Sequence, residues 1–208
     1  MRDLRKALDD IGIIRQQMAT GTVFRGFGPA VMASTGLLAL VTAAVQAAFV
    51  RGDDGKTSEP LQFFSVWVGL AAVSALLVFS EMRARTRRHH GGLADVMLAN
   101  AVEHFLPAGA AGAAVALVLW RFSPDTAWIL PGLWQVLVAI GLFAAQRFLP
   151  RAVVFAAFWY FATGITVMLL SSQTHMLSPW AMGLPFGAGQ LLLAAVLHLA
   201  FRRNNDET

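Results

Sequence analysis

Six long apolar blocks dominate this chain, and each is close to the roughly 20 residues that an α-helix needs to cross a bilayer. Hydrophobic residues make up 57% of the 208 residues and charged residues only 13%, a balance too apolar for a soluble domain of this size. The sequence therefore predicts an all-α, polytopic integral membrane protein. The predicted spans are Phe27–Val50, Leu61–Met82, Val96–Trp120, Ala127–Gln146, Ala152–Ser171 and Leu177–Phe201.

The segment before the first span, residues 1–25, carries apolar residues three and four positions apart, among them Leu4, Leu8 and Ile11. Its charged residues lie largely elsewhere around a helical wheel, so we expect an amphipathic helix on the membrane surface. The alternative is a helix that docks on a soluble partner. The predicted organisation is this surface helix, a transmembrane domain over residues 27–201 and a tail over residues 202–208.

Lysine and arginine are distributed unequally between the two sides of the predicted membrane domain. Of the 16 such residues, all but Arg51, Lys56 and Arg121 lie on the side that holds both termini. Because cytoplasmic loops carry the excess of these residues, both termini are expected in the cytoplasm. The chain has no cysteine, which excludes disulfides and thiolate metal sites.

A weak internal repeat is visible in the second half of the chain. Phe105–Pro107 recurs as Phe148–Pro150. The Ser-Pro pair at 123–124, with its later Leu-Pro and Gln, recurs 54 or 55 residues on, from Ser178 to Gln190. Such a pattern is typical of a parallel repeat of three helical hairpins. Similar residue preferences at membrane edges would produce the same pattern without duplication.

Four segments of the C-terminal half resemble small, uncharacterised bacterial six-helix inner-membrane proteins: Leu130–Gln135, Arg147–Arg151, Tyr160–Gly164 and Leu177–Gly183. The resemblance implies a bacterial inner (cytoplasmic) membrane protein that crosses the membrane several times. It implies no activity.

The polar residues of the third span are the main candidates for a site. Asn100, Glu103 and His104 are three and four positions apart, so they share one side of a helix. Glu103 lies seven residues into a span that begins at Val96, where a charge needs a partner, a proton or water. Alternatively, an 18-residue span that begins at Glu103 would leave both ionisable groups at the interface.

His198 on the sixth span and Glu81 on the second are the expected partners, because both lie at the cytoplasmic side with His104. Two imidazoles and two carboxylates suit a proton relay or a divalent metal held by Glu103, His104 and His198. His104 and His198 could also ligate a b-type haem. The spacing identifies no metal or haem motif, so the cofactor stays unassigned. Each histidine alone is also typical of a helix end.

Pro107 and Pro185 lie inside predicted spans and are expected to kink or break their helices. Small residues over 108–116, and the pair Gly183 and Gly187, permit close helix contact within the bundle or in a homo-oligomer or with a membrane partner. Four amides are expected to tie helices together: Gln46, Gln135, Gln173 and Gln190. In a repeat, Gln135 and Gln190 could instead face each other across a cavity.

A basic run between the second and third spans, with Arg83, Arg85, Arg87 and Arg88, is expected to hold an anionic lipid surface rather than nucleic acid. Three functions remain open. The first is a carrier or sensor that binds a small molecule or ion in a cytoplasmic-half pocket between the third and sixth spans. The second is a metal- or haem-dependent membrane enzyme or redox protein. The third is a structural or regulatory subunit. We favour the first, because six spans leave little soluble chain for a catalytic domain.

Overall fold

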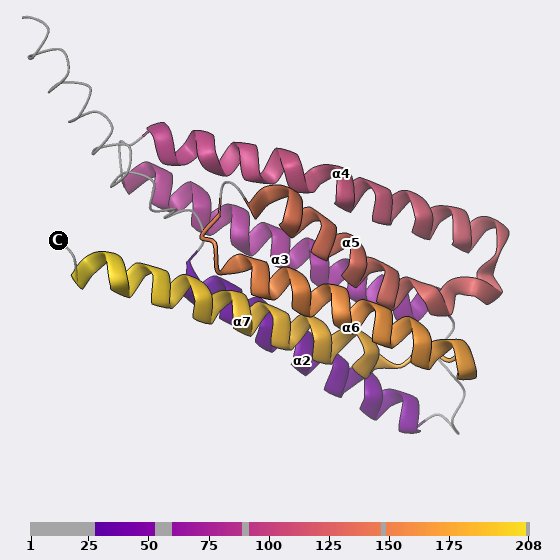
Figure 1. Cartoon of the computed structure of the whole chain (residues 1–208). Coiled ribbons are helices and arrows are strands. Elements are labelled where there is room, and N and C mark those ends of the chain that lie inside the picture. The colour runs from indigo at the N-terminus through magenta and orange to yellow at the C-terminus, as the bar shows by residue number, and fades with distance from the viewer. Residues whose placement is uncertain (1–27, 53–59, 89–91, 147–148, 207–208) are drawn as a thin grey trace, which may run out of the picture.

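A computed structural model describes residues 28–52, 60–88, 92–146 and 149–206, and these ranges contain helices and no strand (Figure 1). The all-α prediction is confirmed for this part of the chain. The predicted surface helix over residues 1–25 lies outside it. The helices are α2 (Pro29–Gly52), α3 (Pro60–Arg88), α4 (Gly92–Phe122), the short 3₁₀ helix η1 (Pro124–Ile129), α5 (Leu130–Ala145), α6 (Val153–Thr174) and α7 (Pro179–Asp206).

Six stretches of these helices are long and apolar enough to cross a membrane, as the sequence predicts. Their limits are Pro29–Phe49, Pro60–Glu81, Val102–Phe122, Pro124–Ala145, Val153–Thr174 and Pro179–Ala200. The fourth stretch combines η1 with α5. The third differs from the prediction in an informative way: α4 begins at Gly92, ahead of the predicted Val96, but its apolar stretch begins only at Val102.

The helices pack as an open series in the order α3, α2, α7, α6, α5 and α4. The most extensive contacts join α2 to α7 and α5 to α6, whereas α3 and α4, at the two ends of the series, share no extensive contact. Figure 1 shows α4 at the edge of the bundle beside α5. Only 6% of the α4 stretch and 11% of the α3 stretch are buried inside the protein, against 44% for α5 and α7. A core of α2, α5, α6 and α7 therefore carries two peripheral helices.

Glycines allow the two closest helix pairs to form. A Cβ atom added at Gly132 of α5 would lie 2.5 Å from the carbonyl oxygen of Gly164 on α6. One added at Gly36 of α2 would lie 2.9 Å from the carbonyl oxygen of Gly187 on α7. No side chain fits in these positions, so the backbones touch directly. We call these two contacts the α5–α6 seam and the α2–α7 seam.

The remaining core is filled by small and aromatic side chains. Tyr160 and Ala156 of α6 pack against Ala139 of α5 and Leu193 of α7, and all four are buried. A second cluster joins Ala43 of α2 and Phe63 and Trp67 of α3 to Met182 of α7, with Phe186 beside them. Alanine at the helix crossings keeps the axes close, while the aromatic rings fill the space where the helices diverge.

Pro107 and Pro185 were expected to kink or break their helices, and neither breaks its helix. α4 runs through Pro107 and α7 runs through Pro185 as continuous helices. A proline inside a helix removes one backbone N–H, so the carbonyl four residues earlier loses its usual donor. Within a membrane that carbonyl needs another donor, and for Pro185 the structure contains one, as described below.

The α5–α6 seam yields a stability prediction. Gly132→Ala or Gly164→Ala should lower the free energy of unfolding by about 1–3 kcal/mol, because the new methyl group would meet backbone atoms that cannot move aside independently. Thermal unfolding of the protein in detergent measures the change. Ala162→Leu, on the exposed face of α6, is the control and should have little effect. Equal losses in both variants would contradict the role given to the seam.

Candidate functional site

The ionisable residues predicted to form a site lie on helices that do not pack together. Glu103 and His104 are exposed on α4, and His198 is exposed on α7. The neighbours of α4 are α5 and η1, whereas α7 packs on α2, α6 and α5. Among the residues that the structure describes, no group of three histidine, aspartate or glutamate side chains could hold a metal ion. The expected convergence of Glu103, His104 and His198 is therefore not found.

The other predicted members of this group are also on peripheral helices. Glu81 is half-buried at the end of the apolar stretch of α3, and Asn100 lies in the first turns of α4, where side chains are not described. Glu103 is the second residue of the apolar stretch of α4. This position agrees with the alternative in which Glu103 and His104 lie at the membrane boundary. The residues before Glu103 nevertheless continue the same helix back to Gly92.

A buried amide, Gln135 of α5, links two helices of the core. Its side chain is fully buried, and its Nε2 donates to the carbonyl oxygen of Ala181 on α7 at 2.8 Å and to that of Pro131 at 3.1 Å. Ala181 lies four residues before Pro185, so its carbonyl is the one that the proline leaves without a backbone donor. Gln135 replaces the missing N–H from a neighbouring helix. This explains how α7 continues through Pro185.

Two aromatic side chains of α6 bond the same part of α7. Trp159 Nε1 donates to the carbonyl oxygen of Pro185 at 3.0 Å, and the Tyr160 hydroxyl donates to that of Phe186 at 3.4 Å. Gly189 makes room for the Tyr160 ring, since a Cβ there would overlap it. About one turn beyond Phe186, Gln190 Oε1 lies 3.5 Å from the Thr35 hydroxyl of α2. The turn around Pro185 is thus held by α2, α5 and α6 together.

A second amide ties α2 to α3. Gln46 Oε1 accepts a hydrogen bond of 2.9 Å from Trp67 Nε1, and Gln46 Nε2 donates to the carbonyl oxygen of Phe63 at 3.5 Å. The prediction that glutamines tie helices together is confirmed for Gln46 and Gln135. For the alternative, a cavity between Gln135 and Gln190, Gln135 Nε2 bonds backbone, whereas Gln135 Oε1 is buried without a hydrogen-bond partner in the described part of the chain, so this alternative stays a prediction. The signal in the sequence was an amide, Gln135, within one predicted span and a proline, Pro185, within another.

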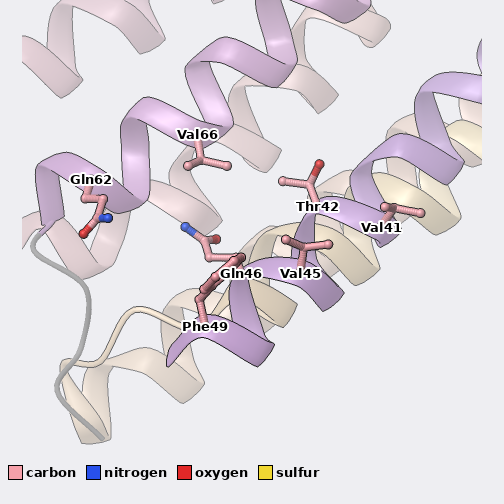
Figure 2. Close-up of a pocket in the computed structure, with 7 residues that line it drawn as sticks. All are labelled: Val41, Thr42, Val45, Gln46, Phe49, Gln62 and Val66. Atoms are coloured by element: carbon pink, nitrogen blue, oxygen red, sulfur yellow. The ribbon is translucent and has the colours of Figure 1, made fainter. Parts of the chain in front are cut away.

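A hollow that could take a ligand lies beside Gln46, in the crevice between α2 and α3 (Figure 2). Its volume is about 380 Å³, and it is open on one side. Figure 2 shows Gln46 rising from α2 towards Val66 of α3. The crevice is lined by Val41, Thr42, Val45, Gln46, Phe49, Gln62 and Val66.

The chemistry of the crevice is apolar with neutral polar groups. Four of the residues that line the crevice are valine or phenylalanine, and its polar groups are one hydroxyl and two amides. No ionisable side chain is found among the described residues that line it. Phe49 is 75% exposed and Val45 is 49% exposed, so the crevice opens onto the face that lipid would cover. Sequence reasoning missed this place, because its residues are ordinary span residues that only packing brings together.

Comparison of the chain with known protein families, with curated proteins and with solved structures finds no match. The resemblance of the C-terminal half to small bacterial inner-membrane proteins therefore stays a prediction.

The link between Gln135 and Pro185 can be tested by a double-mutant cycle. Gln135→Leu should lower the free energy of unfolding by about 1–3 kcal/mol, because it leaves the Ala181 carbonyl unpaired in the core. In a Pro185→Ala background the same substitution should cost clearly less, since the alanine introduced in α7 would supply the missing N–H. Chemical or thermal unfolding in detergent measures all four proteins. Strictly additive effects would show that the two residues do not act on one carbonyl.

Proposed function

We propose that this chain is a multi-pass membrane protein that binds a neutral, amphipathic small molecule in the crevice between α2 and α3, as a carrier or a sensor. The observation that carries the proposal is the crevice itself. About 380 Å³ is within the size range of ligand-binding pockets, which combine apolar walls with a few polar groups. The site differs from the pocket expected between α4 and α7, since those helices do not pack together.

The lining supports a neutral ligand with a hydrogen-bonding head and a short apolar chain. Valine and phenylalanine side chains suit the apolar chain, while the amide of Gln62 can both donate to and accept from a hydroxyl or carbonyl group. Gln46 is already bonded to Trp67, which fixes its orientation beside the crevice. A bare ion would find neither an opposite charge nor enough oxygen ligands among the described lining residues.

The placement of the protein in a cell is part of the same proposal. The unequal distribution of lysine and arginine supports both termini in the cytoplasm of a bacterium, with the protein in its inner membrane. α3 continues as a helix for seven residues beyond the end of its apolar stretch at Glu81. This extension is about 10 Å long and carries the four arginines of the basic run. Its position next to the apolar stretch favours contact between these arginines and anionic lipid headgroups.

Ligand binding can be tested with a photoreactive fatty alcohol, a decanol that carries a terminal diazirine. In the purified protein it should label peptides that contain Val41–Phe49 and Gln62–Val66 more than other exposed helix faces. Val45→Trp should lower this labelling roughly tenfold by filling the crevice. Leu169→Trp, on an exposed position of α6, is the matched control and should not change it. Even labelling of all exposed faces would overturn the proposal.

The polar part of the site gives a separate prediction. Gln62→Leu should reduce labelling by the diazirine decanol several-fold, since the amide can no longer bond the hydroxyl group. Labelling by the matching alkane, which has no hydroxyl, should be unchanged or stronger. Peptide mass spectrometry measures both. If the two probes respond alike, Gln62 does not recognise the head group.

The orientation is tested by fusing green fluorescent protein, which matures in the bacterial cytoplasm, to Thr208. A fluorescent fusion is expected. A dark C-terminal fusion, together with activity of alkaline phosphatase fused at the same residue, would contradict the assignment of the C-terminus to the cytoplasm.

A further inference from the structure

The crevice between α2 and α3 begins at one boundary of the apolar part of the bundle. Phe49 is the last residue of the apolar stretch of α2, and Gln62 is the third residue of that of α3. Trp180, near the start of α7, lies at the same end, because the α2–α7 seam is antiparallel. Tryptophan is enriched at membrane–water interfaces. The crevice therefore starts at the membrane boundary that lies away from the C-terminal end of α7.

The amides and the apolar groups of the crevice lie at different depths. Gln46 lies three residues before Phe49, so the amides of Gln46 and Gln62 are both within about 5 Å of the boundary along their helices. Val41 lies eight residues before Phe49, about 12 Å from it, and Val66, the seventh residue of its stretch, lies about 9 Å in. The outer end of the crevice thus offers amides, and the inner end offers valine methyl groups.

Thr42 is the one polar residue among the described residues that line the inner end. A threonine hydroxyl in a helix can bond a carbonyl of the turn before it. Thr166 does so on the exposed face of α6, where its Oγ1 donates to the carbonyl oxygen of Ala162 at 2.9 Å. The Thr42 hydroxyl can be satisfied in the same way, so the inner end does not require a polar group from the ligand.

The crevice opens sideways, towards lipid, along its whole length. Val41, Val45 and Val66 are 50%, 49% and 40% exposed, and Phe49 is 75% exposed (Figure 2). In a bilayer such a face is covered by lipid chains. A molecule dissolved in the membrane can therefore enter the crevice from the side, whereas a solute in water reaches only its outer end.

Open space continues beyond the inner end of the crevice on α3. Gly69 lies seven residues after Gln62 and three after Val66, which places all three residues on one face of the helix. A Cβ atom added at Gly69 would have no atom within 4 Å. No described side chain closes this face at Gly69, so an apolar chain longer than the crevice can continue along it.

We infer that the ligand of the crevice is a single-chain neutral lipid, such as a long-chain alcohol or a monoacylglycerol, from the membrane leaflet on the side where α2 ends. Its head group lies at Gln62, and its chain runs inward past Val66 and Gly69. The inference rests on the proposed function, which assigns a neutral amphipathic ligand to this crevice. It adds the source of that ligand, its orientation and the path of its chain.

The described lining residues favour such a lipid over a phospholipid. None of them is ionisable, and a phosphate group held there would lack an opposite charge. On α3 the lining forms a single row, Gln62 and Val66 with Gly69 beyond them, which suits one chain rather than two.

Two photoreactive dodecanols test the orientation, one with its diazirine next to the hydroxyl group and one with it at the other end of the chain. In membranes that contain the protein, the first should label Phe49 and Gln62, and the second Val41 and Gly69, each with a preference of roughly threefold or more. Residue-resolved mass spectrometry measures the labelling. A reversed pattern, or equal labelling at both depths, would overturn the inference.

The path of the chain is tested with Gly69→Leu. This substitution should lower labelling of the crevice by the dodecanol probes about fivefold, because the new side chain obstructs the path, and should leave labelling by a diazirine hexanol unchanged. Ala71→Leu is the matched control: Ala71 is also exposed, and two residues turn the helix by about 200°, away from the crevice. Equal effects of the two substitutions would overturn the assigned path.

Failure of this inference is distinct from failure of the proposed function. If the hexanol probe labels the crevice as strongly as the dodecanol probes and Gly69→Leu affects neither, the ligand is a small solute. That result would overturn the lipid assignment and keep the crevice as a binding site. If no probe prefers the crevice to the exposed face around Leu169 of α6, both the proposed function and the inference are overturned.

Discussion

Direct contact between helix backbones is the constraint on which the rest of this structure depends. At Gly132 with Gly164, and at Gly36 with Gly187, no Cβ lies between the two helices. Within a bilayer the hydrophobic effect does not draw helices together, because lipid is as apolar as their side chains. Close packing at these glycines therefore decides which helices are neighbours. It places α2, α5, α6 and α7 in the core and leaves α3 and α4 at the periphery.

The position of α7 between these neighbours makes its internal proline tolerable. Pro185 removes the donor of the Ala181 carbonyl, and the Gln135 amide reaches this oxygen because the seams bring α5, α6 and α7 close together. Trp159 and Tyr160 add two further bonds to the same turn. Pro185 alone would weaken the sixth span, but side chains of α5 and α6 bond the backbone of α7 around it. Gln135 Nε2, Trp159 and Tyr160 thus serve the packing of the helices.

The candidate ligand site lies beside a peripheral helix, α3. α3 is held to α2 by the Gln46–Trp67 bond and a few apolar contacts, and the crevice beside that bond remains open. A peripheral helix thus supplies one wall of the proposed site.

The sequence by itself determined the class of protein and the number of spans, because length and hydropathy alone decide whether a helix can cross a bilayer. It also indicated that glutamines would tie helices together, and Gln46 and Gln135 do so. It predicted a site around Glu103, His104 and His198, since all three lie on the predicted cytoplasmic side of the membrane domain. Only the tertiary structure could show that α4 and α7 are not neighbours, because helix adjacency depends on backbone approach at particular glycines and not on the polarity of a span. The crevice beside Gln46 is visible only in the tertiary structure for the same reason, because it is defined by how α3 packs on α2.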